Sequence, residues 1–364
     1  MEKALKYIAL GLTILNFPTI SLFVFGGSVG SIVSILSFLV ILLYAVYTKS
    51  LSPSIWYIFI WASYYCISAF QIYPHIEPRD FIARCFKFLI LAVFAGAILK
   101  NTSKREMFWF LLIGASSIIL NAVLFPDDYG RYSGFYVDPN AAGLVCIVGY
   151  ALTYGIKNSK ERILGQFIFS LGGFMTFSRT FILIWLLLNL IALKISLKNA
   201  KIFILGAIAI IILISFSEKL QLNADRFQQM KSIVTNEKVN TEELSEGSRT
   251  ETWSIFYKYI ADKPFFGNGF GSFHGNGVYR IGPHNTFLFI IGEAGIIALA
   301  IFMAFQFVLL KKSLFHFNEH PFLTMLFVAQ SLFLLTNHDY FTNYYLFFVT
   351  LWFYLYIKKI EHEN

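Results

Sequence analysis

Apolar segments recur along the chain at lengths that suit membrane helices. A helix needs about 20 mostly apolar residues to cross about 30 Å of hydrocarbon. About twelve segments have this character, with approximate limits 5–25, 29–47, 54–72, 81–99, 106–125, 141–156, 163–177, 181–196, 202–217, 285–310, 322–337 and 341–357. The pattern therefore predicts an all-α polytopic membrane protein with about 12 transmembrane helices.

One long polar connection interrupts this pattern late in the chain. It divides the sequence into nine membrane helices over 1–217, a large loop over 218–284 and three membrane helices over 285–364. Long loops with structure of their own tend to be functional. We expect this loop to be partly helical and to lie on the outer face of the membrane.

The basic residues indicate the orientation of the chain, because cytoplasmic connections carry an excess of Lys and Arg. With a cytoplasmic N-terminus, the inside segments hold Lys3, Lys6, Lys49, Lys100, Lys104, Arg105, Lys157, Lys160, Arg162, Lys194, Lys198, Lys201, Lys311, Lys312, Lys358 and Lys359. The short outside loops hold only Arg79, Arg131 and Arg179. Both termini are therefore predicted to be cytoplasmic. The first apolar run lacks a small-residue cleavage site, so no cleaved signal peptide is expected.

Composition agrees with a membrane protein and limits the chemistry. The chain is 57% hydrophobic and 14% charged, whereas soluble domains average about 45–50% and about 25%. The net charge of +8 follows from topology, so we expect no nucleic-acid partner. The cysteines lie in apolar runs without metal spacing. Asp127-Asp128 and His338-Asp339 lack a further set of ligands at regular spacing, so we predict no metal and no cofactor, and a structural or substrate-contacting role for both pairs.

The end of the large loop carries a helix signature. Ser248 and Glu251 have the spacing of a capping box. The apolar residues that follow share one helical face: Trp253, Phe256, Tyr257 and Ile260. Lys263-Pro264 then ends the predicted helix. The Gly-rich segment 267–272 resembles a phosphate-binding fingerprint, but it follows a helix stop rather than a strand, so we interpret it as a tight turn.

Arg249 falls at the first position of that predicted helix. Helix N-termini attract anions, and the guanidinium fork suits phosphate. The alternative is a solvated arginine in a flexible loop. Further along, RIGPHN places Arg280, His284 and Asn285 where the chain returns to the membrane. A histidine can exchange a proton near neutral pH; the alternative is that His-Asn only caps the helix.

Other polar groups are predicted on the same outer face. Arg131 precedes an Asp-Pro-Asn turn in which Asn140 is a candidate N-cap. Arg179 lies between two apolar runs, where an arginine costs about 2.5–3.5 kcal/mol at helix centre. One charge-assisted hydrogen bond returns about 1.5–3 kcal/mol, so several anionic contacts, as in a pyrophosphate, or snorkelling to the interface would account for it. Arg84 and Lys87 near the outer end of the fourth span have the same two interpretations.

These motifs together resemble the O-antigen polymerase and O-antigen ligase superfamily of bacterial envelope glycosyltransferases. The pattern is an Arg, a Trp, Pro-x-x-Gly-x-Gly, His-Asn at the return to the membrane, and a Gly ten residues later. The matching residues are Arg249, Trp253, Pro264, Gly267, Gly269, His284, Asn285 and Gly295. Two further sequence elements of the superfamily have similar counterparts in this chain. The first matches Arg131, Ser133, Gly134, Pro139 and Asn140, and the second matches Ser178 and Arg179. Ala298 stands where the ligase pattern has Gly, Thr or Tyr.

The resemblance implies a bacterial inner-membrane enzyme that transfers a glycan from undecaprenyl pyrophosphate at the periplasmic face, without metal. Arg179 and Arg249 would bind the pyrophosphate, and His284 would orient or deprotonate the acceptor hydroxyl. The further substrate-binding candidates are Arg131, Asn140, Asn285, Arg84, Lys87 and Arg280. Donor and acceptor would both be lipid-linked oligosaccharides, in contact with membrane lipids, and a separate chain-length regulator is expected.

Three functions remain open at this point. A polymerase would move the growing chain onto the next lipid-linked repeat unit, and we favour it because the ligase pattern is incomplete at Ala298. A ligase would move finished glycan onto the lipid A core. A transporter or flippase ranks lower, because such proteins show repeat symmetry and polar helices near the midplane, whereas the polar groups here gather at one face.

Overall fold

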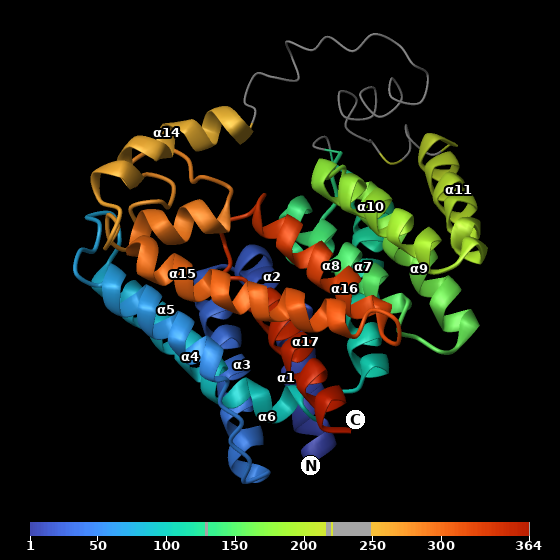
Figure 1. Ribbon diagram of the computed structural model, residues 1–364, viewed down its shortest axis with the longest axis horizontal. Coiled ribbons are helices and arrows are strands. Elements are labelled where there is room, and N and C mark those ends of the chain that lie inside the picture. Colours follow the sequence, from blue (N-terminus) through green and yellow to red (C-terminus); the bar gives the residue numbers. More distant parts are fainter. Residues whose placement is uncertain (128–129, 216–219, 221–248, 364) are drawn as a thin grey trace.

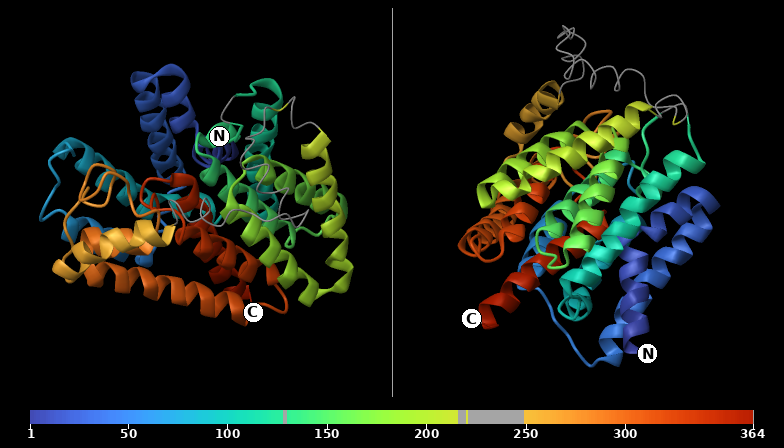
Figure 2. Two further views of the ribbon diagram at one scale, coloured as in Figure 1. Left: turned by 90° about the horizontal axis from the view of Figure 1, so that it is seen from above. Right: turned by 90° about the vertical axis from the view of Figure 1, so that its right-hand side faces the viewer.

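The computed structural model describes residues 1–127, 130–215, 220 and 249–363, and every regular element in this part of the chain is a helix. Ile72 and Phe270 form one isolated bridge. Figure 1 shows the helices gathered into one bundle, with both termini at one end and α14 (Arg249–Asp262) at the other. The second view of Figure 2 shows the same separation. An all-α fold is therefore confirmed for the described residues.

The helices follow the apolar segments closely. Those before the large loop are α1 (Glu2–Ile14), α2 (Phe17–Phe25), α3 (Gly27–Tyr47), α4 (Ile55–Trp61), α5 (Pro78–Ile90), α6 (Gly96–Leu99), α7 (Lys104–Leu124), α8 (Pro139–Thr153), α9 (Ser159–Met175), α10 (Arg179–Ile195) and α11 (Lys201–Ser215). Two π-helical turns, η1 (Ala62–Cys66) and η2 (Leu91–Ala95), and two 3₁₀ turns, η3 (Gly134–Tyr136) and η4 (Leu197–Ala200), connect or extend them. After α14 come α15 (Thr286–Phe315), α16 (Pro321–Leu334) and α17 (Tyr344–Glu363).

Five described helical segments are long and apolar enough to cross a membrane, and a sixth is counted if α1 and α2 form one broken span. Several other predicted spans lie on shorter helices. The 15 residues of α8 rise about 22 Å, and nearly all of them are buried among α7, α9, α10 and α16. The chain thus has the character of a multi-pass membrane protein, while the number of about 12 spans stays a prediction.

The first predicted span, 5–25, is broken rather than continuous. Helices α1 and α2 meet at an angle of 60°. Asn16 between them has φ 55°, the left-handed conformation that asparagine tolerates better than most residues. Pro18 sits in the first turn of α2, where its missing N–H does no harm. The break therefore falls at Asn16, a polar residue within a mostly apolar segment.

Part of the predicted loop structure is confirmed. Helix α14 begins at Arg249 and ends just before Lys263-Pro264. Phe256 is buried and its ring lies 4.9 Å from that of Phe273, but Tyr257 is exposed, so it is wrongly assigned to the apolar face. Ser248, the cap of the predicted capping box, and the polar segment 236–248 lie outside the described residues.

The Gly-rich segment 267–272 forms turns that pack against a kink in α15. Gly295 has φ 75° inside that helix, and a Cβ there would meet the Phe265 carbonyl oxygen at 2.0 Å. The Ile296 N–H donates to the Pro264 carbonyl, at 2.8 Å, and the Asn268 N–H donates to the Gly292 carbonyl, at 2.7 Å. The turn therefore satisfies backbone groups that the kink releases from the helix.

Candidate functional site

The loop 335–343 between α16 and α17 lies against the start of α15 and contributes residues to the candidate site. The Thr286 hydroxyl, in the first turn of α15, donates to the Asn337 carbonyl at 2.7 Å. The Asp339 N–H donates to Asn337 Oδ1 at 2.7 Å. These bonds fix the loop beside the point where the chain enters α15, so His338 and Asp339 lie next to the His284-Asn285 pair.

His284 and Asn285 have different roles in the structure. Asn285 is buried, and its side-chain oxygen caps α15 by accepting from the N–H groups of Phe287 and Leu288 at 2.9 and 3.2 Å. His284 is exposed and has φ 47°. Its ring centroid lies 5.0 Å from that of His338, edge to face. Asn285 thus supplies the side-chain cap of α15, and the His284 imidazole is presented at the surface beside a second histidine.

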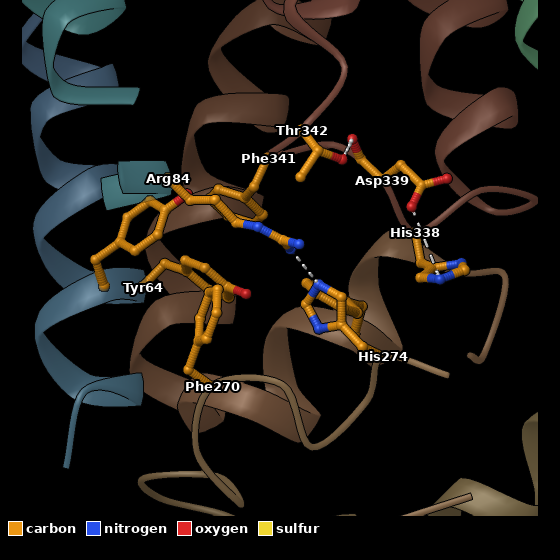
Figure 3. Close-up of a pocket in the computed structure, with 10 residues that line it drawn as sticks. Tyr64, Arg84, Phe270, His274, His338, Asp339, Phe341 and Thr342 are labelled. Carbon is orange, nitrogen blue, oxygen red and sulfur yellow. Dashed lines mark hydrogen bonds and ion pairs between the residues drawn. The ribbon is translucent and has the colours of Figure 1, made fainter. Parts of the chain in front are cut away.

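A chain of polar side chains runs from α5 into α15. Arg84 Nη1 lies 3.0 Å from His274 Nε2 (Figure 3), and His274 Nδ1 lies 3.0 Å from Glu293 Oε1. Glu293 is fully buried and also accepts from the Tyr64 hydroxyl at 2.5 Å and from the Phe273 N–H at 3.0 Å. A buried carboxylate is tolerated only when it is paired and hydrogen-bonded. The arrangement favours His274 with its proton on Nδ1, so that Nε2 accepts from Arg84.

Arg84, His274, His338 and Asp339 line a small pocket with aromatic walls (Figure 3). Burial lowers the pKa of the His338 imidazole, Asp339 opposes this shift, and His284 adds to it. His338 Nδ1 is buried without a hydrogen-bond partner in the described part of the chain. A neutral imidazole is therefore the favoured form of His338 at neutral pH.

His274, Glu293 and Tyr64 are site residues that sequence reasoning missed. One signal was present: Glu293 interrupts the apolar run FIIGEAGII, and a carboxylate at membrane depth is costly and usually functional. Its partners gave no such signal, because Tyr64 lies in the third apolar run and His274 in a Gly-rich turn.

The second group of predicted residues also comes together. Arg131 Nε donates to the Thr176 carbonyl at 3.0 Å, and the Ser178 hydroxyl donates to Asn140 Oδ1 at 3.1 Å. The segment 131–140 thus lies against the break between α9 and α10. Asn140 is not the N-cap of α8, contrary to expectation. Asp138 holds that position and accepts from the Ala141 N–H at 2.8 Å, because Pro139 suits the first helical position.

Arg179 is the first residue of α10 and is exposed. Ser178 caps the helix through its hydroxyl, and Phe177 has φ 48°. The chain therefore breaks here, and Arg179 stands at a helix N-terminus rather than in the middle of an apolar helix. The dipole of α10 and the guanidinium both favour an anion at this place.

The remaining candidates are less closely tied to the cluster. Lys87 is one helical turn beyond Arg84, and its Nζ lies 5.7 Å from the centre of the Phe38 ring. Arg280 is exposed in the loop before α15. Arg249 begins α14, but its side chain lies outside the described part of the structure. Among the described residues, no group of three or more His, Cys, Asp or Glu side chains is placed to hold a metal ion.

One comparison with known proteins gives a partial match to a family model. A family model described as O-Antigen ligase matches residues 164–303. The matched segment contains Arg179, Arg249, His284 and Asn285. This match supports the resemblance to the O-antigen polymerase and ligase superfamily over that segment, which is less than half of the chain. No curated protein matches the chain.

Proposed function

We propose that this protein is a surface-polysaccharide polymerase. It transfers the growing glycan from undecaprenyl pyrophosphate onto the next lipid-linked repeat unit, at the periplasmic face of a bacterial inner membrane. The family match, which includes His284, supports glycan transfer in general. The observation that carries the proposal is the exposed His284 at the start of α15. Its ring centroid lies 5.0 Å from that of His338, and Arg84 lines the adjoining pocket together with His338.

In the proposed mechanism, His284 is the general base. It takes the proton from an acceptor hydroxyl, and the hydroxyl oxygen forms the new bond to the anomeric carbon of the donor sugar. The bond between that carbon and the pyrophosphate oxygen breaks, and undecaprenyl pyrophosphate leaves with the electron pair. A direct displacement of this kind inverts the anomeric configuration. General-base help is worth about 10²–10⁴-fold in rate.

Arginine side chains would hold the leaving group. Arg179 and Arg249 both stand at the first position of a helix, where the dipole adds to the guanidinium charge. Stabilising the charge that grows on the pyrophosphate lowers the barrier to bond breaking. Arg84 is a further candidate, because one of its nitrogens is fixed by His274 and its other N–H groups donate to no residue in the described part of the chain.

The other predicted site residues are assigned supporting roles. Asn285 positions His284 through the cap rather than by contact with substrate, because its side-chain oxygen is occupied by backbone N–H groups. Arg131 and Asn140 support the start of α10 through the Thr176 and Ser178 bonds. Lys87 and Arg280 are assigned to lipid phosphate. The proposal also includes the membrane topology: about twelve spans, a large periplasmic loop and cytoplasmic termini. A separate protein is expected to regulate the length of the glycan.

Transfer of finished glycan to the lipid A core is the second candidate. The description of the matching family model favours it, and both reactions need the same base and the same leaving-group contacts. We prefer the polymerase because Ala298, a buried residue of α15, departs from the ligase pattern.

The deciding experiment is a gel of surface lipopolysaccharide from a strain lacking the gene, beside the complemented strain. A polymerase predicts core bearing a single repeat unit in the deletion strain and a ladder after complementation. Bare core, with polymer accumulating on undecaprenyl pyrophosphate, would instead identify the ligase. An unchanged ladder in the deletion strain would exclude both.

A further inference from the structure

A second cavity lies beside the candidate site, and none of the roles above uses it. Its volume is about 260 Å³, and it lies between the α1–α2 break, the start of α8 and the loop 335–343. We call it the amide cavity after its polar lining: Asn16, Thr19, Asp138, Asn337, Asp339 and Asn343. Segments more than 300 residues apart in sequence thus contribute polar side chains to one hollow.

The amide cavity adjoins the proposed base. Asp339 lines both this cavity and the pocket of Figure 3. Its neighbour His338 contacts His284 ring to ring. A molecule in the amide cavity therefore sits next to the loop that holds His338 and Asp339, and Arg84 is not among the residues that line this cavity.

The two hollows differ in charge. Arg84, His274 and His338 line the pocket of Figure 3. The lining of the amide cavity contains no Lys, Arg or His, and two of its residues, Asp138 and Asp339, carry carboxylates. A phosphate would meet like charge there, whereas hydroxyl groups would meet amides, which donate and accept hydrogen bonds, and carboxylates, which accept them.

Part of this hydrogen-bonding capacity is unused in the described structure. The Asn343 side chain forms no hydrogen bond there, although its N–H donates to the Asp339 carbonyl. One carboxylate oxygen of Asp138 caps α8, and the other accepts no hydrogen bond from a described residue. Tyr136 and Tyr345 form an aromatic wall, with ring centroids 5.2 Å apart. Polar groups beside an aromatic face suit a sugar ring, which has hydroxyls at its edge and C–H groups on its faces.

We propose that the amide cavity binds a neutral sugar residue of the acceptor glycan. This assignment rests on the proposed glycan transfer and adds to it the place of the acceptor. The volume is below the about 300–1,000 Å³ of pockets that enclose drug-sized ligands, so the cavity holds a single sugar residue rather than a repeat unit. The acceptor chain then reaches His284 from the amide side, and the lipid pyrophosphate lies on the arginine side.

The test uses the full-length protein in nanodiscs and one soluble probe. The probe is a single repeat-unit oligosaccharide released from the polysaccharide of the host strain, free of lipid and phosphate. Binding is measured by saturation-transfer NMR titration. Asn343→Leu replaces the amide with an apolar side chain, and Thr19→Val removes a hydroxyl from a different element. Gln71→Leu, which removes an exposed amide outside the cavity, is the matched control.

We expect Asn343→Leu to weaken probe binding at least tenfold and Thr19→Val to weaken it severalfold, with Gln71→Leu unchanged. In transfer assays, Asn343→Leu should raise the half-saturating concentration of acceptor and leave that of the donor unchanged. Wild-type affinity in both cavity variants, or a shift in the donor value alone, would overturn the acceptor assignment.

The two proposals fail separately. His284→Ala should bind the probe normally and transfer no glycan. Loss of transfer in that variant, together with normal probe binding by both Asn343→Leu and Thr19→Val, would refute the cavity and leave the enzyme assignment standing. Normal glycan transfer by His284→Ala would refute the assignment of His284 as general base. The binding titration would still show whether the amide cavity binds the acceptor sugar.

Discussion

The guanidinium of Arg84 and the imidazole of His274 meet at 3.0 Å, between Nη1 and Nε2, although 190 residues separate them in the chain. The contact joins the middle of α5 to the Gly-rich turn before α15. Behind His274, the carboxylate of Glu293 is completely buried. The orientation of Arg84 toward the pocket therefore depends on a carboxylate that does not contact the pocket itself.

The first prediction concerns that carboxylate. Glu293→Gln keeps the size of the side chain and removes its charge, so it weakens the hydrogen bonds from Tyr64 and His274. Because bonds to charged groups are worth about 1.5–3 kcal/mol each, we expect a clear fall in the thermal unfolding temperature in detergent and reduced glycan transfer. Lys312, whose partner Glu361 is about one-third exposed, offers the control: Lys312→Met should change stability little. Equal melting of Glu293→Gln and wild type would contradict the structural role.

His284→Ala should abolish glycan transfer while the protein still inserts into the membrane. The loss should be about 10²–10⁴-fold, the usual value of general-base catalysis. The exposed position of His284 means that the substitution creates no cavity in the core. His75→Ala, at another exposed histidine, is the matched control and should retain activity. A wild-type ladder of polysaccharide from His284→Ala cells would rule out the catalytic assignment.

Arg179→Ala should raise the apparent KM for the lipid-linked donor, because it removes a charge at the N-terminus of α10. We expect at least a tenfold change, equivalent to one charge-assisted hydrogen bond of about 1.5 kcal/mol or more. Arg79→Ala offers a control, since Arg79 is largely exposed and pairs with Glu77 at 2.6 Å. Donor titrations with the purified variants provide the measurement, and identical donor curves for the two variants would count against a pyrophosphate site at Arg179.

The protein should lose stability in mild acid through His338. Burial holds the pKa of this imidazole below its usual value, so protonation is harder in the folded state than in the unfolded state. The corresponding stabilisation is complete above the ordinary histidine pKa of about 6.5 and is lost as the pH falls through the lower, folded-state value. His338→Asn should flatten the dependence of the unfolding temperature on pH below about 6.5, and parallel curves for variant and wild type would contradict this account.

Several features of the site were readable from local sequence, and one was misread. The helix from Arg249 to Lys263-Pro264 and the return of the chain at His284-Asn285 follow from spacing and helix stops. Asn140 was wrongly chosen as the cap of α8, although Asp138 followed by Pro139 is the better local signal. The breaks at Asn16 and Gly295 lie within continuous apolar runs. The break at Asn16 has a local signal in Asn16 and Pro18, whereas the bend at Gly295 depends on the close approach of the Phe265 carbonyl.

The sequence by itself determined the helical character, the places of most helices and the family resemblance, because hydrophobic length and turn chemistry act over a few residues. The tertiary structure decided which polar groups meet. It joined Arg84 to His274 and Glu293, set His338 against His284, and brought Asn16 and Asp138 to the loop at Asn343. These contacts span long sequence separations, and they depend on how buried helices pack together, since a polar group taken from water must find its partner wherever the packed chain places it.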